Sequence, residues 1–459
     1  MVSSSRYLVA SGLLRSTQRR CMSNSGKVIN TTLSTVASVT QEVSNKQDLY
    51  LTDPVSLGSV FFLPNGAKVF NKLVQFMKLQ QQNYGFNEVI TPIIYKKTLW
   101  EQSGHWENYK DDMFRVEGND CAKEEYGLKP MNCPGHCVIF KRSERSYNDL
   151  PLRYSDFSPL HRNEASGGLS GLSRVRKFHQ DDGHIFCTEE QVAEELRKTL
   201  QLVDLCYTTV FPMAKEEKNG SFYRMHLSTR PSKYVGDLEV WNRAESVLKS
   251  TLEETNMDWS IKEGDGAFYG PKIDIMVKDH TGKSHQVATI QLDFQLPERF
   301  NLKYRDKDGS YKTPIMIHRA VFGSVERFMA MLLDSNGGNW PFWLNPHQCI
   351  VIPVNTTNKD IIAFSNKVLE KLRGNVTDSM KPVPLHSFHF NADIDSREES
   401  VSYRTREAIN KKYSYIVMIG EKEVEQSKVA LRSRDSRKVE MLSLDELYNK
   451  FCELEQNYK

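Results

Sequence analysis

The apolar positions between residues 66 and 84 recur at intervals of three and four, which is the spacing of one face of an α-helix. The residues on this face are Val69, Phe70, Leu73, Phe76, Met77 and the polar Gln80. Asn65 can cap the N-terminus of such a helix, and Gly85 is typical of the position that follows one. We therefore predict a helix over 66–84, followed by a strand that begins at Phe86 and stops at Pro92.

A second helical pattern begins with a capping box. Thr188 places a hydroxyl at the helix start and Gln191 places an amide three residues later, which predicts a long helix through about Phe211. Two runs with β-like composition, 267–277 and 284–294, are set apart by Gly, Asp and Lys. Runs of strands with few alternating helices favour an α+β domain built on an antiparallel sheet.

The pattern changes after residues 340–343, where strands and helices begin to alternate. We predict strands at 349–354, near Phe388, at 415–419 and at 429–434, and helices at 360–372, 403–412 and 443–455. Such alternation implies a small open α/β domain of about 115 residues. The chain is therefore expected to hold a leader at 1–41, a larger domain at 42–343 and a smaller domain at 344–459.

The composition is that of a chain with packed cores. Of the 459 residues, 39% are hydrophobic and 10% are aromatic, which excludes a disordered or collagen-like polymer. The mean hydropathy is -0.53, and no uninterrupted apolar run reaches the length of a membrane span. These features argue against an integral membrane protein.

The first 41 residues differ from the rest of the chain in charge. Their charged residues are Arg6, Arg15, Arg19, Arg20 and Lys27. The formal net charge is +3 for the whole chain and about -2 without these five residues. A polyanionic partner must therefore meet local basic patches on a nearly neutral body.

The leader has the composition of a mitochondrial transit peptide. It is rich in Ser and Arg, lacks acids, and interleaves Tyr7, Leu8, Leu13 and Leu14 with the arginines. A basic terminus without function is the alternative, and a secretory signal is disfavoured because no long apolar segment is present. The eight cysteines are scattered without a CxxC pair, so we expect a reducing compartment and no disulfide framework.

Candidate chemistry concentrates in four short segments between residues 101 and 330. They are MNCPGH (131–136), HRNE (161–164), QDDGH (180–184) and IHR (317–319). None of them is a strong motif alone, because an isolated cysteine or histidine is more often packed or solvated than a ligand. The chain has no P-loop, no GxGxxG after a strand and no HExxH, so the common nucleotide-binding and zinc-protease signatures are absent.

Taken together and in order, the segments resemble those of threonyl-tRNA synthetases, a family of class II aminoacyl-tRNA synthetases. The resemblance is carried by WEQSGHWENY (100–109), KPMNCPGH (129–136), LHRNEAS (160–166), RVRKFHQDDGHIFCT (174–188), FYGPKID (268–274) and MIHRAVFGSVERF (316–328). The match runs from about residue 48 to residue 459. With its leader and without an editing region, the chain is most similar to the mitochondrial members of fungi.

The resemblance implies ATP-dependent ligation of L-threonine to threonine tRNA through threonyl-adenylate, in translation in the mitochondrial matrix. It implies a class II catalytic domain over 42–343, an antiparallel sheet flanked by helices, and an α/β anticodon-binding domain over 344–459. Mg²⁺ would accompany ATP and neutralise charge as pyrophosphate leaves. The predicted helix at 66–84 is similar to motif 1, which forms a homodimer interface in the family, although an ordinary core helix explains the stripe equally well.

Motif 2 of the family corresponds to residues 157–182 and would bind ATP. Arg162 matches the arginine at the α-phosphate, where a preorganised guanidinium stabilises the developing charge. Adenine would lie between an aromatic ring and a second arginine. The other residues that the resemblance assigns to ATP are Glu164, Arg174, Phe178, Gln286, Ser324 and Arg327. Without the resemblance, these arginines would be read as surface residues.

The resemblance assigns Cys133, His184 and His318 as ligands of one Zn²⁺ per chain. One thiolate and two imidazoles leave positions open on the ion, which is the pattern of a substrate-binding zinc. In the family these positions take the amino and hydroxyl groups of threonine, so valine would be rejected strongly. The side chains assigned to threonine binding are Gln180, Asp182, Tyr269, Lys272 and Gln291. The nearby His136, His161 and His179 receive no role.

His105 matches a histidine near the terminal ribose of the tRNA, where it can help to move a proton. A buried structural histidine is the alternative. In the C-terminal domain we expect Arg434 to contact the anticodon, although a salt-bridged arginine on an exposed strand is nearly as good an explanation.

The stretch between the leader and the core match is too short to fold a hydrolytic domain, so no cis editing domain is expected. Two alternatives to the main interpretation remain. Another class II synthetase, for example seryl or prolyl, is disfavoured by the Cys133, His184 and His318 set. A catalytically inactive paralogue that binds RNA or a protein partner is disfavoured by the retained Arg162 and Arg327.

Overall fold

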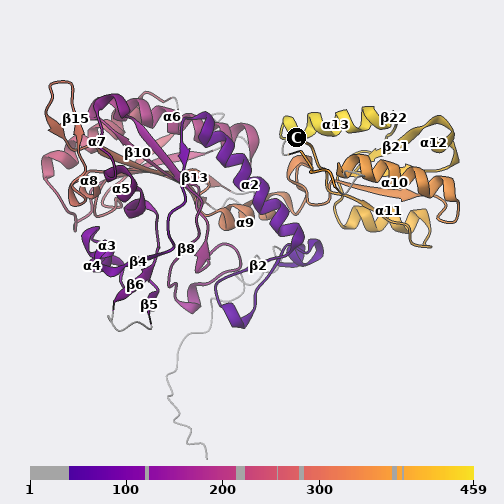
Figure 1. Ribbon diagram of the computed structural model, residues 1–459, viewed down its shortest axis with the longest axis horizontal. Coiled ribbons are helices and arrows are strands. Elements are labelled where there is room, and N and C mark those ends of the chain that lie inside the picture. Colours follow the sequence, from indigo (N-terminus) through magenta and orange to yellow (C-terminus); the bar gives the residue numbers. More distant parts are fainter. Residues whose placement is uncertain are drawn as a thin grey trace, which may run out of the picture.

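The computed structural model describes residues 41–118, 124–212, 223–255, 257–278, 284–374, 380–384 and 387–459. Figure 1 shows a larger body and, at the C-terminal end of the chain, a smaller body drawn in orange and yellow. The predicted leader at 1–41 lies outside the described residues except for its last position. Among the described helices, none combines the length and the apolar character that crossing a bilayer requires.

The larger body is built on an eight-stranded sheet. Its strands, in spatial order, are β12 (Trp259–Lys262), β11 (Arg224–Ser228), β13 (Lys272–Lys278), β14 (Ser284–Asp293), β17 (Ile315–Ala320), β10 (Asp182–Cys187), β7 (Leu152–Asp156) and β3 (Asn87–Glu88). The inner pairs are antiparallel, and the outermost pair at each edge is parallel. The predicted α+β class with an antiparallel sheet is therefore confirmed.

The two faces of this sheet carry different side chains because successive residues of a strand point to opposite faces. On β10 the back face holds Ile185 and Cys187, and both belong to the main hydrophobic core. The other face of β10 holds Asp182, His184 and Phe186, and Phe186 packs in a separate cluster. We call the face with Asp182 and His184 the front face.

Helices cover both faces. Behind the sheet lie α2 (Pro64–Asn83), α6 (Val192–Asp204), α7 (Leu238–Glu253) and α9 (Val325–Asn336), whose buried residues join the main core. On the front face lie α5 (Cys133–Lys141) and α8 (Gln295–Arg299), which pack against Phe186 and Met316.

Several short elements lie outside the eight-stranded sheet. The paired strands are β1 (Tyr50–Leu51) with β2 (Phe61–Phe62), β8 (Leu160–His161) with β9 (Lys177–Phe178), and β15 (Tyr304–Arg305) with β16 (Tyr311–Lys312). A three-stranded sheet has the order β4 (Ile94–Lys96), β6 (Glu125–Leu128) and β5 (Arg115–Glu117), and the helices α3 (Lys97–Gln102) and α4 (His105–Tyr109) follow β4.

The structure corrects the predicted start of the first helix. Helix α2 begins with Pro64 in its first turn, where the missing N–H of proline costs nothing, and no side chain caps it. The Asn65 side chain instead donates to the carbonyl of Gln47 at 2.9 Å. The predicted end is confirmed, since the helix stops at Asn83 and Gly85 has a φ of +80°. The strand that follows pairs only over Asn87–Glu88.

The capping box at Thr188 is confirmed. Both of its hydrogen bonds are present, and the chain continues through a short 3-10 turn, η4 (Glu189–Gln191), into α6. A π-helical turn, η5 (Leu205–Val210), extends the helical segment to Phe211. The prediction of a long helix from Thr188 to about Phe211 therefore holds, with two changes of hydrogen-bond pattern inside it.

The smaller body contains a five-stranded mixed sheet. Its strands, in spatial order, are β19 (Ala392–Ile394), β18 (Cys349–Pro353), β20 (Tyr415–Ile419), β21 (Lys428–Ser433) and β22 (Val439–Ser443). Its helices are α10 (Lys359–Arg373), α11 (Val401–Asn410), α12 (Glu421–Gln426) and α13 (Leu444–Gln456). The strand expected near Phe388 forms four residues later, at Ala392, and α12 and β22 were not predicted.

The two bodies meet at the short turn η6 (Phe342–Leu344). Phe342 packs in the core of the smaller body, whereas the next residue, Trp343, packs in the main core. The C-terminus returns to the larger body, because Lys72 on α2 pairs with Glu455 on α13 and donates to the carbonyl of Trp343 at 2.6 Å. These contacts fix the smaller body against α2.

Candidate active site

A row of side chains crosses the front face at the centre of the sheet. The register pairs Tyr154 with His184, His184 with His318, His318 with Gln291, and Gln291 with Lys272. Residues paired across neighbouring strands lie side by side on one face. Strands from distant parts of the sequence thus bring four of the predicted site residues into one line.

Helix α5 adds a sulfur ligand to this row. It begins at Cys133, with Pro134 in its first turn, and buries Cys133 completely above the sheet. A Cβ atom at Gly135 would lie 2.6 Å from the Tyr95 hydroxyl, so this close packing of the helix start requires glycine. The ligand atoms of Cys133, His184 and His318 lie within 4.8 Å of one another.

The donor atoms of this cluster fit a zinc ion. His184 Nε2 and His318 Nδ1 lie 2.9 Å apart and face each other. The remaining ring nitrogen of His318, Nε2, lies 2.8 Å from the Asp293 carboxylate. Sulfur with two imidazole nitrogens suits Zn²⁺, and a carboxylate behind a ligand histidine is the usual outer partner. Burial, and then the neighbouring Asp182, raises the pKa of the Cys133 thiol well above its usual range, so a cation is needed to stabilise the thiolate.

Polar side chains surround the cluster on the front face. Asp182 is buried, and its carboxylate accepts a hydrogen bond from Asn132 at 3.1 Å. The Tyr269 hydroxyl donates to the Gln291 amide oxygen at 3.2 Å. Gly270 allows this contact, because a Cβ atom there would collide with the carbonyl of Leu292. Of the predicted threonine-binding residues, Tyr269 and Gln291 therefore lie next to His318, and Asp182 lies next to His184.

Two further predicted pocket residues share one carboxylate. The Lys272 ammonium lies 2.9 Å from Asp274 Oδ2, and the Gln286 amide donates to Asp274 Oδ1 at 2.6 Å. Asp274 is buried. This arrangement ties β13 to β14 and fixes the positions of both side chains beside the pocket. Gln180, which precedes β10, forms an isolated β-bridge with Ser324.

Four of the residues predicted to bind ATP lie on β9 or in the segment that joins β8 to β9. The Arg162 guanidinium lies over the Phe178 ring at 5.0 Å, and its Nε donates to the carbonyl of Pro130 at 3.3 Å. Arg174 is largely exposed and pairs with Glu164, with Nε and the carboxylate oxygen 2.8 Å apart. Glu164 and Arg174 therefore neutralise each other, and ATP would have to replace this contact.

The start of α9 supplies the remaining predicted ATP residues. The Ser324 hydroxyl caps the helix by accepting from the backbone N–H of Arg327 at 3.2 Å. The Ser324 hydroxyl in turn donates to the Glu326 carboxylate at 3.2 Å. Ser324 thus has a structural role in placing Arg327, which is half-buried.

His105 lies beside the metal-binding cluster. It is 2% exposed, its Nδ1 lies 2.7 Å from the Ser103 hydroxyl, and its Nε2 lies 4.0 Å from Cys133 Sγ. Burial lowers the pKa of His105 to about 4, so the ring is neutral at physiological pH. A neutral imidazole of this kind can accept a proton, but the tRNA ribose would have to reach it through a buried position.

Arg434 lies at the junction of the two bodies. Its guanidinium pairs with Asp435 at 3.0 Å and donates to the carbonyl of Trp340 at 3.4 Å, and the side chain is 14% exposed. An anticodon base would have to displace these partners. The assignment of Arg434 to the anticodon stays a prediction.

Three residues close to the cluster were not assigned by sequence reasoning. Asp293 contacts His318, Asn132 contacts Asp182, and His136 contacts His184. Two of them follow from local periodicity: Asp293 lies two residues after Gln291 on a strand, and His136 lies three residues after Cys133 on a helix. Asn132 has no such signal, because its position depends on the long-range pairing of α5 with β10.

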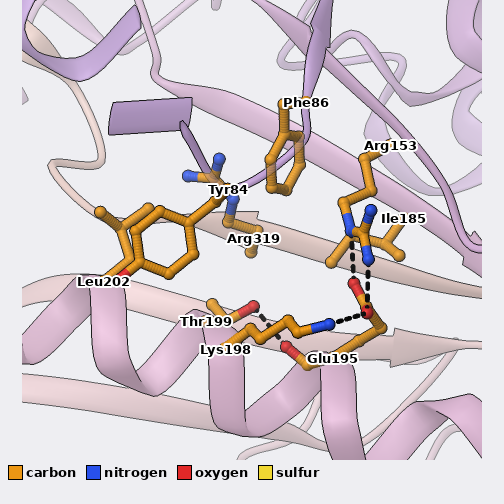
Figure 2. A pocket seen from close by; sticks show the side chains of 9 residues that line it. All are labelled: Tyr84, Phe86, Arg153, Ile185, Glu195, Lys198, Thr199, Leu202 and Arg319. Atoms are coloured by element: carbon orange, nitrogen blue, oxygen red, sulfur yellow. Dashed lines mark hydrogen bonds and ion pairs between the residues drawn. The ribbon is translucent and has the colours of Figure 1, made fainter. Parts of the chain in front are cut away.

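The back face explains the arginine of the IHR segment. Arg319 follows His318 on β17 and therefore points to the opposite face, where its guanidinium lies 4.2 Å from the centre of the Phe86 ring. Figure 2 shows Arg319 at a small cavity beside the ion pair of Arg153 and Glu195, whose two contacts are 2.6 Å each. Arg319 belongs to the packing of α6 against the sheet and not to the metal-binding cluster.

Comparison with known proteins supports this arrangement. Residues 114–336 match the family model of the tRNA synthetase class II core domain (G, H, P, S and T), and residues 348–454 match that of an anticodon binding domain. The fold is therefore that of a class II aminoacyl-tRNA synthetase.

Similarity to individual proteins identifies the family within this class. The chain is 61% identical over 434 residues to the mitochondrial threonine–tRNA ligase of Saccharomyces cerevisiae, and this covers 94% of each chain. It is 46% identical to a probable mitochondrial threonine–tRNA ligase of Schizosaccharomyces pombe, over 91% of this chain and 89% of that protein. A crystal structure of the RNA binding domain of threonyl-tRNA synthetase from Cryptosporidium parvum superposes with a TM-score of 0.81 at 43% identity, over 90% of this chain and 98% of that one. The chain belongs to the threonine–tRNA ligases.

Proposed function

We propose that this ligase selects L-threonine at a zinc ion held by Cys133, His184 and His318, works as a homodimer, and acts in the mitochondrial matrix. Its class activates an amino acid with ATP and Mg²⁺ and transfers it to tRNA, and nothing in the relatives favours an inactive paralogue. The observation that carries the zinc assignment is the approach of the three ligand atoms to within 4.8 Å of one another on the front face.

The donor set also explains the choice of substrate. A zinc ion with three protein ligands keeps positions for the amino and hydroxyl groups of threonine. The buried carboxylate of Asp182, on the same face as His184, is available to accept a hydrogen bond from the threonine hydroxyl. Gln291 and Tyr269 hold each other and would shape the rest of the pocket. A site built on polar contacts rejects an analogue that lacks the hydroxyl, so valine is excluded more strongly than a purely apolar slot would allow.

Arg162 would serve the activation step. Its guanidinium is held by Phe178 and by the Pro130 carbonyl at the front-face edge next to α5. A fixed cation at this place would stabilise the charge on the α-phosphate as the threonine carboxylate attacks and pyrophosphate leaves. Arg174 and Arg327 would hold the remainder of ATP.

The test of this step is threonine-dependent exchange of pyrophosphate into ATP. We expect Arg162→Gln to reduce the exchange rate by about 100-fold or more, since one preorganised donor contributes that much. Arg243→Gln serves as the matched control, because Arg243 is an exposed arginine on α7 with a single distant ion pair. Equal exchange by the two variants would contradict the role given to Arg162.

An exposed apolar strip supports the homodimer. Ile90, Ile93 and Ile94 are 85%, 39% and 46% exposed, and they line a groove of about 520 Å³ together with Pro92 and Pro159. Exposed apolar patches on folded domains mark interaction sites. The strip follows α2 and β3, the elements similar to motif 1.

Sedimentation tests the dimer directly. We expect the wild-type chain to sediment as a dimer and Ile90→Asp to sediment as a monomer, because a charge cannot be buried unpaired at the interface. Val383→Asp is the control, since Val383 is a half-exposed apolar residue in the smaller body. A wild-type chain that stays monomeric at high concentration would refute the proposal.

The domain division at 42–343 and 344–459 is part of the same proposal. The split of Phe342 and Trp343 between two cores supports a boundary at η6. The mitochondrial names of the relatives support a mitochondrial location, and we propose the matrix because tRNA charging there would serve translation.

A further inference from the structure

His136 is buried directly behind one of the proposed zinc ligands. Its Nδ1 lies 2.8 Å from Nδ1 of His184, and the two rings meet edge to face with centroids 4.7 Å apart. This contact involves the nitrogen of His184 that points away from His318. The residue is fully buried, and the cluster of possible metal ligands in the described chain does not include it.

One proton between these two nitrogens decides whether His184 can bind a metal. A neutral imidazole carries a proton on one nitrogen and a free lone pair on the other. If the shared proton belongs to His184, its Nε2 is free to bind zinc and His136 is the acceptor. If the proton belongs to His136, the proton of His184 lies on Nε2 and points into the metal position.

Asp156 favours the first arrangement. Its Oδ2 lies 3.8 Å from His136 Nε2, which has no other partner among the described residues. A carboxylate on that side stabilises a proton on Nε2 and so leaves Nδ1 of His136 as an acceptor. His184 must then donate from Nδ1, which places the lone pair of its Nε2 toward His318 and Cys133.

The position of Asp156 is itself fixed. It is fully buried, and it accepts hydrogen bonds from the backbone N–H and hydroxyl of Thr91 at 3.2 and 2.6 Å and from the backbone N–H of Ser158 at 2.7 Å. Lys129 lies 3.6 Å away. Burial raises the pKa of Asp156, but the contacts of its carboxyl group with His136, Ser158 and Thr91 and the charge of Lys129 lower it more, so the group is a carboxylate.

We propose that His136, oriented by Asp156, is a positioning residue that fixes the proton of His184 on Nδ1 and so keeps Nε2 available for zinc. The inference rests on the proposed zinc site. In this arrangement the carboxylate of Asp156 acts on His184 through the ring of His136, whereas the carboxylate of Asp293 contacts His318 directly. Outer partners of this kind set the orientation of ligand histidines and the affinity for the metal.

The test compares two substitutions of equal shape. In His136→Asn the side-chain oxygen can accept from His184 Nδ1, whereas His136→Leu has the same size and cannot. Zinc affinity of the metal-free full chain is measured by competition with a chromophoric chelator. We expect the leucine variant to bind zinc about 10- to 100-fold more weakly than wild type, and the asparagine variant to stay within a few-fold.

Thermal unfolding of the metal-free proteins distinguishes a loss of zinc affinity from a packing defect. A packing defect would lower the stability of both variants but would leave their zinc affinities equal to each other. If His136→Leu does not fold, His136→Phe, which keeps the ring, takes its place in the comparison. Equal zinc affinity of the apolar and asparagine variants overturns the inference. A wild-type chain that binds no zinc overturns instead the proposed metal site, so the two failures are distinguishable.

Discussion

Asp293 offers a direct way to change one proton at the proposed zinc site without disturbing the fold. One of its oxygens lies 2.8 Å from His318 Nε2, and the other accepts the backbone N–H groups of Gln295 and Leu296 at the start of α8. In Asp293→Asn the side-chain oxygen can keep the helix contacts. The new amide N–H₂ would then face the His318 N–H, so two donors would meet.

The size of the effect follows from this geometry. Asp293 is fully buried, and a hydrogen bond to a charged group is worth about 1.5 to 3 kcal/mol. His318 can relieve the conflict by moving its proton to Nδ1, which is the nitrogen that faces His184. Either outcome weakens zinc binding, and 1.5 to 3 kcal/mol corresponds to about 10- to 150-fold.

The assay is a competition titration of metal-free protein with zinc and a chromophoric chelator, with threonine-dependent pyrophosphate exchange measured on the same samples. Asp237→Asn is the matched control, because Asp237 is an exposed carboxylate that also caps a helix, α7, by accepting from the backbone N–H of Glu239. We expect Asp293→Asn to lose zinc affinity and the control to keep it. Zinc affinity within twofold of wild type in Asp293→Asn would refute the reasoning.

Three further predictions concern stability, fidelity and targeting. Burial lowers the pKa of His347 to about 4, below the value near 6.5 expected in the unfolded chain, so the stability it contributes is complete above about pH 6.5 and is lost as the pH falls toward 4. Between pH 7.5 and 5, denaturant titration should show His347→Gln losing about 2 kcal/mol less than wild type, and equal losses would contradict this. Serine has the amino and hydroxyl groups that bind zinc, and one missing methyl is worth only about 1 to 3 kcal/mol, so pyrophosphate exchange should detect serine activation. Threonine tRNA that carries serine should lose its serine no faster with the enzyme than without it. Rapid hydrolysis of that ester would reveal an editing site. Removing residues 1–20 should leave exchange unchanged and prevent import into isolated mitochondria, and efficient import of the shortened chain would contradict a transit peptide.

Sequence patterns predicted the elements whose hydrophobic spacing is local. The strand Tyr415–Ile419 has the predicted ends, and α10 and α13 begin and end within a residue or so of the predicted positions. The two helices each have one apolar face, so the helical period identifies them, whereas the strand is a short continuous apolar run that is buried on both faces. The predicted end of α2 at Gly85 is equally local, since a left-handed glycine terminates a helix.

Buried or mixed segments were missed for physical reasons. Helix α5 buries residues on all sides near its start, so it shows no apolar stripe, and its Pro134 and Gly135 suggest a loop. We predicted that Asn65 caps α2, but Pro64 allows the helix to begin earlier.

The site itself could not be derived from local patterns. His184, His318 and Gln291 meet because β10, β17 and β14 pair in one register, and that register depends on tertiary packing. Only the family resemblance assigned Cys133 to the same group. The outer residues His136 and Asp293 were not assigned, because a ligand's partner is recognised only once the ligand atoms have been placed.

The most direct test of the account measures zinc and threonine activation together. The purified full chain should contain about one zinc per chain, and removing it should abolish threonine-dependent pyrophosphate exchange, which zinc alone should restore. Cys133→Ala, His184→Ala and His318→Ala should each lose both zinc and exchange while keeping the native circular dichroism spectrum. A metal-free preparation that activates threonine at the normal rate would contradict the central claim.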